Sequence, residues 1–230
     1  MSTFVFVHGH WHGGWCWSRL VAELEPLGHR CIALDLPCTT RDAGTAVNAE
    51  VVVNALQDVD DEVILVGHSA GGLTIPLVVQ SRPVKHLLFI AALLPVPGKS
   101  LADQFAENLN IIDPRFSFLD DGDGFCSIDP ALAPSFFYND CSRADADWAT
   151  SKLRVQTTVT ITEETPLAVW PAIPCSYIYG DLDRVVQPAW AAHAARERLG
   201  IDPVVMTGVG HSPFLSQPRQ LARQILGVIA

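Results

Sequence analysis

The chain has 230 residues, of which 49% are apolar and 17% are charged, and its formal net charge is −10. This composition argues against disorder, because the chain can bury a core, and the scarcity of basic residues argues against a nucleic-acid partner. No apolar run reaches the ~18 residues of a membrane span, and the first ten residues lack the basic start of a signal peptide. We therefore expect a soluble, cytoplasmic protein whose six cysteines are reduced thiols.

Six short apolar runs, each ending at turn residues, predict the strands of a sheet. They span residues 3–7, 30–34, 62–66, 84–91, 175–179 and 203–206. Because the runs show no polar alternation, they suit strands covered on both faces, as in a parallel sheet between helix layers. Stretches with helical spacing lie at residues 14–27, 45–58, 70–80, 188–199 and 213–228. The alternation predicts an α/β fold with a doubly wound, mostly parallel six-stranded sheet.

The alternation of strands and helices is interrupted in the middle of the chain. Half of the 16 prolines lie between Pro95 and Pro174, together with an acidic loop and aromatic clusters. A connection of about 80 residues is too long for a compact domain unless it has structure of its own. We therefore expect residues 95–173 to form an inserted, mainly helical cap, and residues 1–94 and 174–230 to form the core.

The strongest local signal is VILVGHSAGGL, which contains the pattern G-x-S-x-G with Ser69 at its centre. An apolar run precedes the pattern and a helical stretch follows it, which is the context of a nucleophile elbow. Gly67 and Gly71 leave room for the strained turn that exposes the serine. We predict that Ser69 is a nucleophile beside a helix N-terminus, where free N–H groups favour developing negative charge.

A serine nucleophile needs a neighbouring base, and eight histidines compete for that role. His211 follows the last predicted strand, in a glycine-rich loop at the same carboxyl edge of the sheet as Ser69. His68 is expected to point away from Ser69. Three more histidines are expected at helix ends or on helix surfaces: His29, His86 and His193. We therefore predict His211 as the base.

Two aspartates are candidates for the acid that orients this base. Asp181 and Asp183 both lie in CSYIYGDLDRVV, in a loop after the fifth predicted strand and thus at the same edge of the sheet. Asp181 is the more typical turn former, since aspartate often accepts a hydrogen bond from its own backbone in turns. Asp35, after the second predicted strand, is expected to stabilise a loop.

The segment FVFVHGHWHGGWCW follows the first predicted strand and carries three alternate histidines, His8, His10 and His12. We reject a metal site, because the alternation is not maintained in a loop and no Asp, Glu or Cys cluster accompanies it. Gly9 instead allows a close backbone approach, so the N–H groups of His10 and Ala70 are predicted to form an oxyanion hole.

Three tryptophans follow in the same segment. We expect Trp11, together with Gly9, to line a substrate pocket. Trp15 and Trp17 are more typical of core or cap contacts, because large aromatic residues near a helix start are usually packed.

These motifs together resemble the α/β-hydrolase superfamily, and within it the branch of plant methyl esterases, hydroxynitrile lyases and related bacterial esterases. The resemblance rests on HGHWHGGWCW, GHSAGG, FFYNDCSRADADWA, YGDLDRVV and GHSPF, which are spread over nearly the whole chain. It implies Ser69 as nucleophile, His211 as base and Asp183 rather than Asp181 as acid, because the family carries its acid three residues after the turn glycine. It also implies oxyanion donors at His10 and Ala70.

Two departures separate this chain from the hydroxynitrile lyases of that branch, which carry a Thr at the position of Gly9 and a Lys at that of Ser212. Hydrolysis of small hydrophobic or aromatic esters, without a cofactor or metal, is therefore the favoured activity. A hydroxynitrile lyase or a C–C bond hydrolase with the same triad, and a ligand receptor of the same fold, remain alternatives. The expected partner is a small-molecule ester, and a homodimer is possible.

Overall fold

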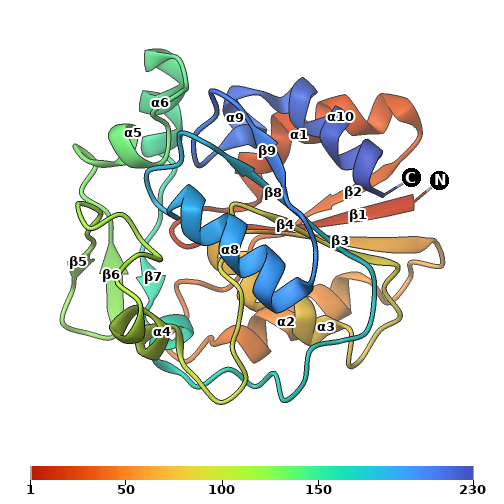
Figure 1. Ribbon diagram of the computed structural model, residues 1–230, viewed down its shortest axis with the longest axis horizontal. Coiled ribbons are helices and arrows are strands. Elements are labelled where there is room, and N and C mark those ends of the chain that lie inside the picture. Colours follow the sequence, from red (N-terminus) through yellow and green to blue (C-terminus); the bar gives the residue numbers. More distant parts are fainter. Residues whose placement is uncertain (1, 230) are drawn as a thin grey trace.

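A six-stranded sheet forms the centre of the computed structural model, which describes residues 2–229 (Figure 1). Its strands are β1 (Ser2–Val7), β2 (Arg30–Ala33), β3 (Glu62–His68), β4 (His86–Ile90), β8 (Cys175–Gly180) and β9 (Val204–Met206). They follow the order β2-β1-β3-β4-β8-β9, and every neighbouring pair is parallel. The predicted doubly wound sheet is confirmed, and its apolar runs are explained because both faces are covered.

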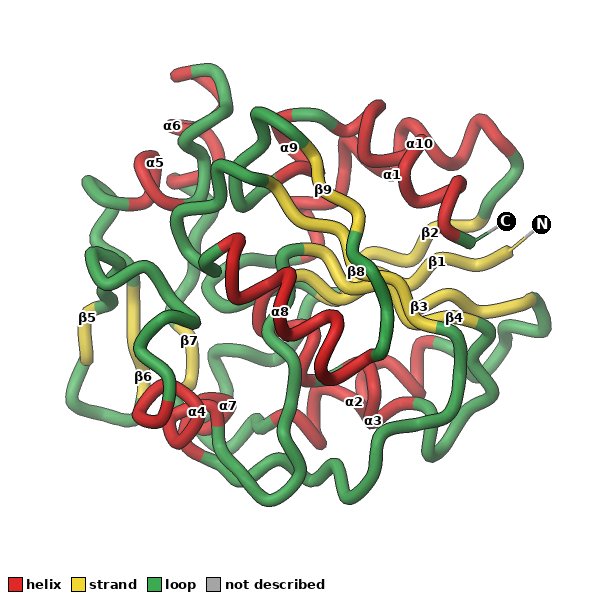
Figure 2. Tube along the Cα trace, in the orientation of Figure 1, coloured by secondary structure: helices red, strands yellow, loops and turns green. Residues whose placement is uncertain are grey.

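Helices cover the two faces of this sheet (Figure 2). One face carries α1 (Ser18–Leu24), α9 (Pro213–Ser216) and α10 (Pro218–Val228), and the other carries α2 (Thr45–Ala55), α3 (Ile75–Val78) and α8 (Pro188–Leu199). The chain winds outward from β1 in both directions, so right-handed crossovers place the connecting helices on opposite faces. Within residues 2–229, no helix combines the length and the apolar character needed to cross a lipid bilayer.

Several predicted helices are divided into shorter pieces. The stretch 14–27 contains η1 (Gly14–Trp17), α1 and η2 (Glu25–Leu27), and the stretch after Ser69 contains η3 (Ser69–Leu73) before α3. Proline explains two of the breaks, because it lacks the N–H of an interior helical residue and clashes with the preceding turn. Pro76 lies in the first turn of α3, and Pro218 begins α10 after α9 has ended.

The inserted segment 95–173 lies at the carboxyl edge of the sheet. It contains the short helices α4 (Leu101–Glu107), α5 (Ala133–Phe136), α6 (Arg143–Thr150) and α7 (Val159–Thr162). It also contains a three-stranded antiparallel sheet, β5 (Leu119–Asp120), β6 (Phe125–Ser127) and β7 (Gln156–Thr157). These strands have two or three residues, too few to leave a periodic pattern, so the sequence did not predict them. The domain boundaries at 94 and 174 stay a prediction.

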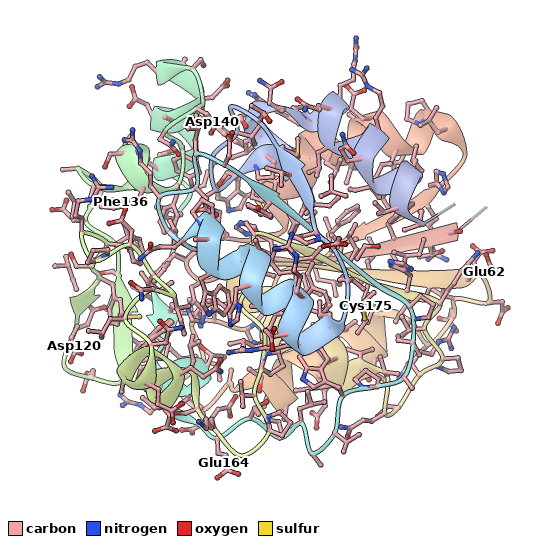
Figure 3. The ribbon with its side chains drawn as sticks, viewed as in Figure 1. Glu62, Asp120, Phe136, Asp140, Glu164 and Cys175 are labelled. Carbon is pink, nitrogen blue, oxygen red and sulfur yellow. The ribbon has the colours of Figure 1, made fainter. Side chains whose placement is uncertain are left out.

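The strands of the main sheet begin at one edge and end at the other, and different residues lie at these two edges. Glu62 and Cys175 begin β3 and β8 and mark the amino edge, while Asp120, Phe136 and Asp140 of the inserted segment lie over the opposite side (Figure 3). The loops that follow β1, β3, β8 and β9 all emerge on the side of the sheet where the inserted segment lies. This arrangement brings the predicted site residues to one edge, as expected for parallel strands.

Candidate active site

Ser69 lies where β3 turns into η3. Its φ is 51°, a left-handed conformation that costs a non-glycine residue about 1–3 kcal/mol. The glycines on either side have no room for side chains. A Cβ at Gly67 would lie 2.9 Å from the carbonyl oxygen of Gly71, and a Cβ at Gly71 would lie 2.3 Å from the carbonyl oxygen of Val7. The G-x-S-x-G pattern therefore reflects two close backbone approaches that hold Ser69 in its strained turn.

A buried carboxylate–imidazole pair lies on the loops after β8 and β9. Nδ1 of His211 and Oδ2 of Asp183 are 2.8 Å apart, and both side chains are almost fully buried. The other carboxylate oxygen accepts the N–H of Val185 at 2.7 Å and that of Val186 at 3.1 Å. Because an ionised carboxylate only accepts, Nδ1 of His211 carries the proton and Nε2 keeps its lone pair. Asp183 thus holds the tautomer that a general base requires.

The two competing aspartates have different partners. Asp181 is exposed, and its Oδ1 accepts the N–H of Gly208 at 2.6 Å. Asp35 is also exposed, and its Oδ1 accepts the N–H of Gly14 at 3.0 Å. Both bonds join neighbouring loops, whereas Asp183 is the aspartate that contacts His211.

His68 connects the turn at Ser69 to His211, the predicted base. It precedes Ser69, is completely buried, and its Nε2–H donates to the carbonyl oxygen of His211 at 3.0 Å. The rings of His68 and His211 lie 4.6 Å apart, centre to centre. Nε2 of His211 is buried and makes no hydrogen bond to any residue of the described range 2–229, so the bond from Ser69 is not formed here. Such bonds often tighten only when substrate binds.

The predicted oxyanion loop packs directly against Ser69. A Cβ at Gly9 would lie 2.7 Å from Cβ of Ser69, so only glycine fits there. The carbonyl oxygen of Gly9 accepts Nδ1–H of His8 at 2.8 Å. The N–H of His10 belongs to the same trans peptide unit as this carbonyl and points in the opposite direction, so it takes no part in the bond to His8. The backbone of His10 thus borders Ser69 from β1, and that of Ala70 follows Ser69 in η3.

The imidazoles of His8 and His12 stabilise this loop. Nε2 of His8 accepts the N–H of Leu36 at 3.1 Å. His12 donates from Nδ1 to the carbonyl oxygen of His10 at 2.8 Å, and its Nε2 accepts the hydroxyl of Tyr138 at 2.9 Å. Burial, the largest cause, lowers the pKa of His8 to about 4 and that of His12 to about 3, so both are neutral near pH 7. Within residues 2–229, no group of three or more His, Cys, Asp or Glu side chains is arranged to hold a metal.

A cavity of about 540 Å³ lies between Ser69 and the inserted segment. Trp11 lines it, is 5% exposed and donates from Nε1 to the carbonyl oxygen of Cys126 at 3.2 Å. Its walls are mainly apolar side chains of the inserted segment, among them Leu101, Phe105, Ile112, Phe116 and Ile161. Gly9, also expected to line the pocket, lies against Ser69 and is not among the residues that line this cavity.

One expectation for the other histidines is wrong. His86 lies on no helix. It begins β4, is 8% exposed, and its Nε2 is 2.9 Å from Oγ of Ser176 on β8. The apolar run 84–91 that predicts this strand already contains His86, so its place in the sheet was accessible from the sequence.

Several side chains that contact the predicted site were not predicted, among them His68, Tyr138, Arg154 and Thr160. His68 belongs to the G-x-S-x-G pattern itself, so its position beside the nucleophile was a usable signal. Tyr138 and Arg154 reach His12 across 126 and 142 residues of sequence, and no local pattern predicts such contacts.

Comparison with known proteins identifies the family. The model of the alpha/beta hydrolase family matches residues 4–224. The chain belongs to this family. It is 28% identical over 257 residues to the probable esterase PIR7A of Oryza sativa subsp. japonica, with 99% of this chain and 96% of that protein covered. It is 38% identical over 104 residues to methylesterase 2 of Arabidopsis thaliana, with 40% of each chain covered.

Solved structures agree on the fold of this hydrolase. The crystal structure of the methylesterase MES16 from Arabidopsis has a TM-score of 0.81 and 22% identity, with 100% of this chain and 99% of that chain covered. The resemblance to the branch that contains plant methyl esterases is thereby confirmed, and the expected enzyme class, a carboxylic-ester hydrolase, agrees with the names of these relatives.

The neutral histidines predict an acid-sensitive fold. Below pH 6.5 the unfolded chain protonates His12 while the folded chain does not until about pH 3, so the free energy of unfolding falls as the pH decreases from 6.5 to 4. His12→Gln removes one such group and should reduce this slope by about 1.4 kcal/mol per pH unit. Urea unfolding at several pH values measures it, with His193→Gln on an exposed face of α8 as the control. Equal slopes for wild type and His12→Gln would contradict the burial argument.

Proposed function

We propose that this protein is a serine esterase that hydrolyses small hydrophobic or aromatic carboxylic esters through an acyl-enzyme, without a cofactor. One arrangement carries the proposal: an apolar cavity of about 540 Å³ opens on Ser69, and His68, which directly precedes Ser69, donates to the carbonyl oxygen of His211, the buried partner of Asp183. A serine at a strained elbow, a histidine of fixed tautomer and a buried acid are the parts that acyl transfer needs.

In the first half of the reaction, Oγ of Ser69 attacks the ester carbonyl and gives its proton to Nε2 of His211. The carbonyl oxygen becomes an oxyanion and accepts the N–H groups of His10 and Ala70. Asp183 stabilises the imidazolium that forms. When the tetrahedral intermediate collapses, the alcohol leaves with the proton from His211, and an acyl group remains on Ser69.

In the second half, a water molecule attacks the acyl carbonyl and gives a proton to Nε2 of His211. The same backbone N–H groups hold the second oxyanion. The bond to Oγ of Ser69 then breaks, Oγ takes the proton from His211, and the carboxylic acid leaves. No step needs an oxidant, a metal or a second substrate other than water.

The cavity supports the substrate class. Its volume lies within the range of roughly 300–1,000 Å³ that is usual for small-molecule sites. Its apolar walls can bind an uncharged hydrocarbon or aromatic group, because removing apolar surface from water contributes about 25 cal/mol per Å² of buried area. A charged substrate group would lose hydration there, and Asp113, a carboxylate among the lining residues, already pairs with Arg115.

Two features support hydrolysis over cyanohydrin cleavage. The lyases of the family carry a Thr at the position of Gly9, but a Cβ there would lie 2.7 Å from Cβ of Ser69. They carry a Lys at the position of Ser212, which is here completely buried. A lysine in that place would bring an unpaired charge into the interior. A receptor of the same fold would bind a ligand and turn it over slowly or once, whereas the proposed esterase turns over many times.

Replacing the nucleophile tests this proposal directly. Ser69→Ala should lower kcat for p-nitrophenyl acetate, butyrate and benzoate by at least about 1,000-fold, because the acyl-enzyme cannot form. Wild type should hydrolyse all three over many turnovers. Ser81→Ala, at an exposed position away from the cavity, is the matched control and should keep wild-type rates. Equal rates for wild type and Ser69→Ala would sink the assignment, and a single turnover by wild type would favour a receptor.

The two neighbouring aspartates provide a second test. Asp183→Asn should lower kcat by about 1,000-fold or more, because an amide N–H facing Nδ1 of His211 favours the wrong tautomer. Asp181→Asn should change kcat by less than about threefold, since an exposed amide oxygen can still accept the N–H of Gly208. Steady-state kinetics of both purified variants give the comparison, and the opposite ranking would exclude Asp183 as the acid.

A further inference from the structure

In residues 8–12, here called the oxyanion loop, four consecutive carbonyl oxygens accept hydrogen bonds. The carbonyl of Gly9 accepts Nδ1–H of His8 at 2.8 Å and the N–H of His12 at 3.4 Å. That of His10 accepts Nδ1–H of His12 at 2.8 Å. That of Trp11 accepts the N–H of Arg154 at 2.8 Å, and that of His12 accepts the guanidinium of Arg154.

Several groups of the inserted segment contact this loop. Oγ1 of Thr160 lies 2.9 Å from Nε2 of His10, the carbonyl oxygen of Cys126 accepts Nε1–H of Trp11, and Arg154 and Tyr138 bind His12. Arg154 donates to the carbonyl oxygen of His12 from Nε at 3.0 Å and from Nη2 at 2.7 Å. Its Nη2 also lies 3.2 Å from Nε2 of His8 and 3.4 Å from Oδ1 of Asp35. Tyr138 donates its hydroxyl to Nε2 of His12 at 2.9 Å. The imidazole and the carbonyl of His12 are thus both hydrogen-bonded by side chains of the inserted segment.

A carbonyl held by a hydrogen bond also fixes the N–H of the following residue, because the two groups belong to one planar peptide unit and point in opposite directions. The loop also contains a strained residue, since Trp11 has a φ of 63°. A bulky residue in this left-handed region persists only where its surroundings enforce it. The backbone N–H and the guanidinium of Arg154 bind the carbonyls of Trp11 and His12, directly after the strained φ.

We propose that Arg154 is a positioning residue for the oxyanion hole, and that Tyr138 supports it through His12. The N–H of His10 shares its peptide unit with the carbonyl of Gly9, which accepts the N–H of His12. The contacts of Arg154 and Tyr138 with His12 therefore act on the N–H of His10 through His12. This inference rests on the proposed ester hydrolysis for its kinetic consequence, but the bracing of the loop can be measured without any substrate.

A direct role of Arg154 in substrate recognition is a different reading, and the contacts do not support it. Arg154 is not among the residues that line the 540 Å³ cavity. Its guanidinium binds the carbonyl of His12 and lies 3.4 Å from Asp35, with a side chain 30% exposed. Its effect should therefore appear in the transition state, where the oxyanion forms, rather than in substrate binding.

The test compares Arg154→Met with Arg143→Met. Arg143 also belongs to the inserted segment, is exposed, and pairs with Asp147 on α6, so it is a matched control without contact to the loop. For p-nitrophenyl butyrate, Arg154→Met should lower kcat per mole of folded enzyme by about 10- to 100-fold and change KM by less than about twofold. Arg154→Lys keeps a charged donor without the planar fork, so it should fall between the two.

Hydrogen exchange followed by mass spectrometry provides the readout that needs no ester. Peptides covering residues 8–14 should exchange about tenfold faster in Arg154→Met than in Arg143→Met. Faster exchange together with a kcat loss supports the proposal. Unchanged exchange, or a loss confined to KM, overturns it. If wild type hydrolyses no ester, the proposed function fails, while the exchange result still decides the bracing. If Arg154→Met does not fold, the same two measurements on Arg154→Lys decide it.

Discussion

The whole site depends on close packing of backbone around Ser69. The end of β1 and the start of η3 approach so closely that a Cβ at Gly71 would overlap the carbonyl of Val7, and a Cβ at Gly9 would overlap Ser69. This packing brings the backbone of two different segments next to Ser69, which is the arrangement that the proposed oxyanion hole needs. A single added methyl group at these glycines would separate the two segments. The proposed chemistry therefore requires this close approach of the backbone.

Parallel strands supply the remaining parts, because their carboxyl ends meet at one edge. The loop after β8 brings Asp183, and the loop after β9 brings His211. His68 then donates to the backbone of His211 and so connects His211 to the strand that leads to Ser69. The inserted segment closes the site from above and also contacts the oxyanion loop. The core and the inserted segment therefore both contact the oxyanion loop, although they are far apart in sequence.

Sequence patterns could predict the parts that local physics determines. Apolar runs gave the sheet, and the spacing of Gly67, Ser69 and Gly71 gave the elbow, because strand burial and tight turns each restrict residue type locally. The choice of Asp183 over Asp181 came from family resemblance, since both lie at the same edge. The small sheet of the insertion and the reach of Arg154 to His12 were not predictable, because contacts over more than 100 residues leave no periodic trace.

The most direct test of the account is covalent labelling with a fluorophosphonate, which reacts with a serine activated by a base and an oxyanion hole. Intact mass and peptide mapping should show one label per chain, located on Ser69, and the label should be lost in Ser69→Ala. Labelling should also slow by at least about 100-fold in Asp183→Asn, since the base is then misoriented. A label on any other residue, or ester hydrolysis by a protein that takes up no label, would contradict it.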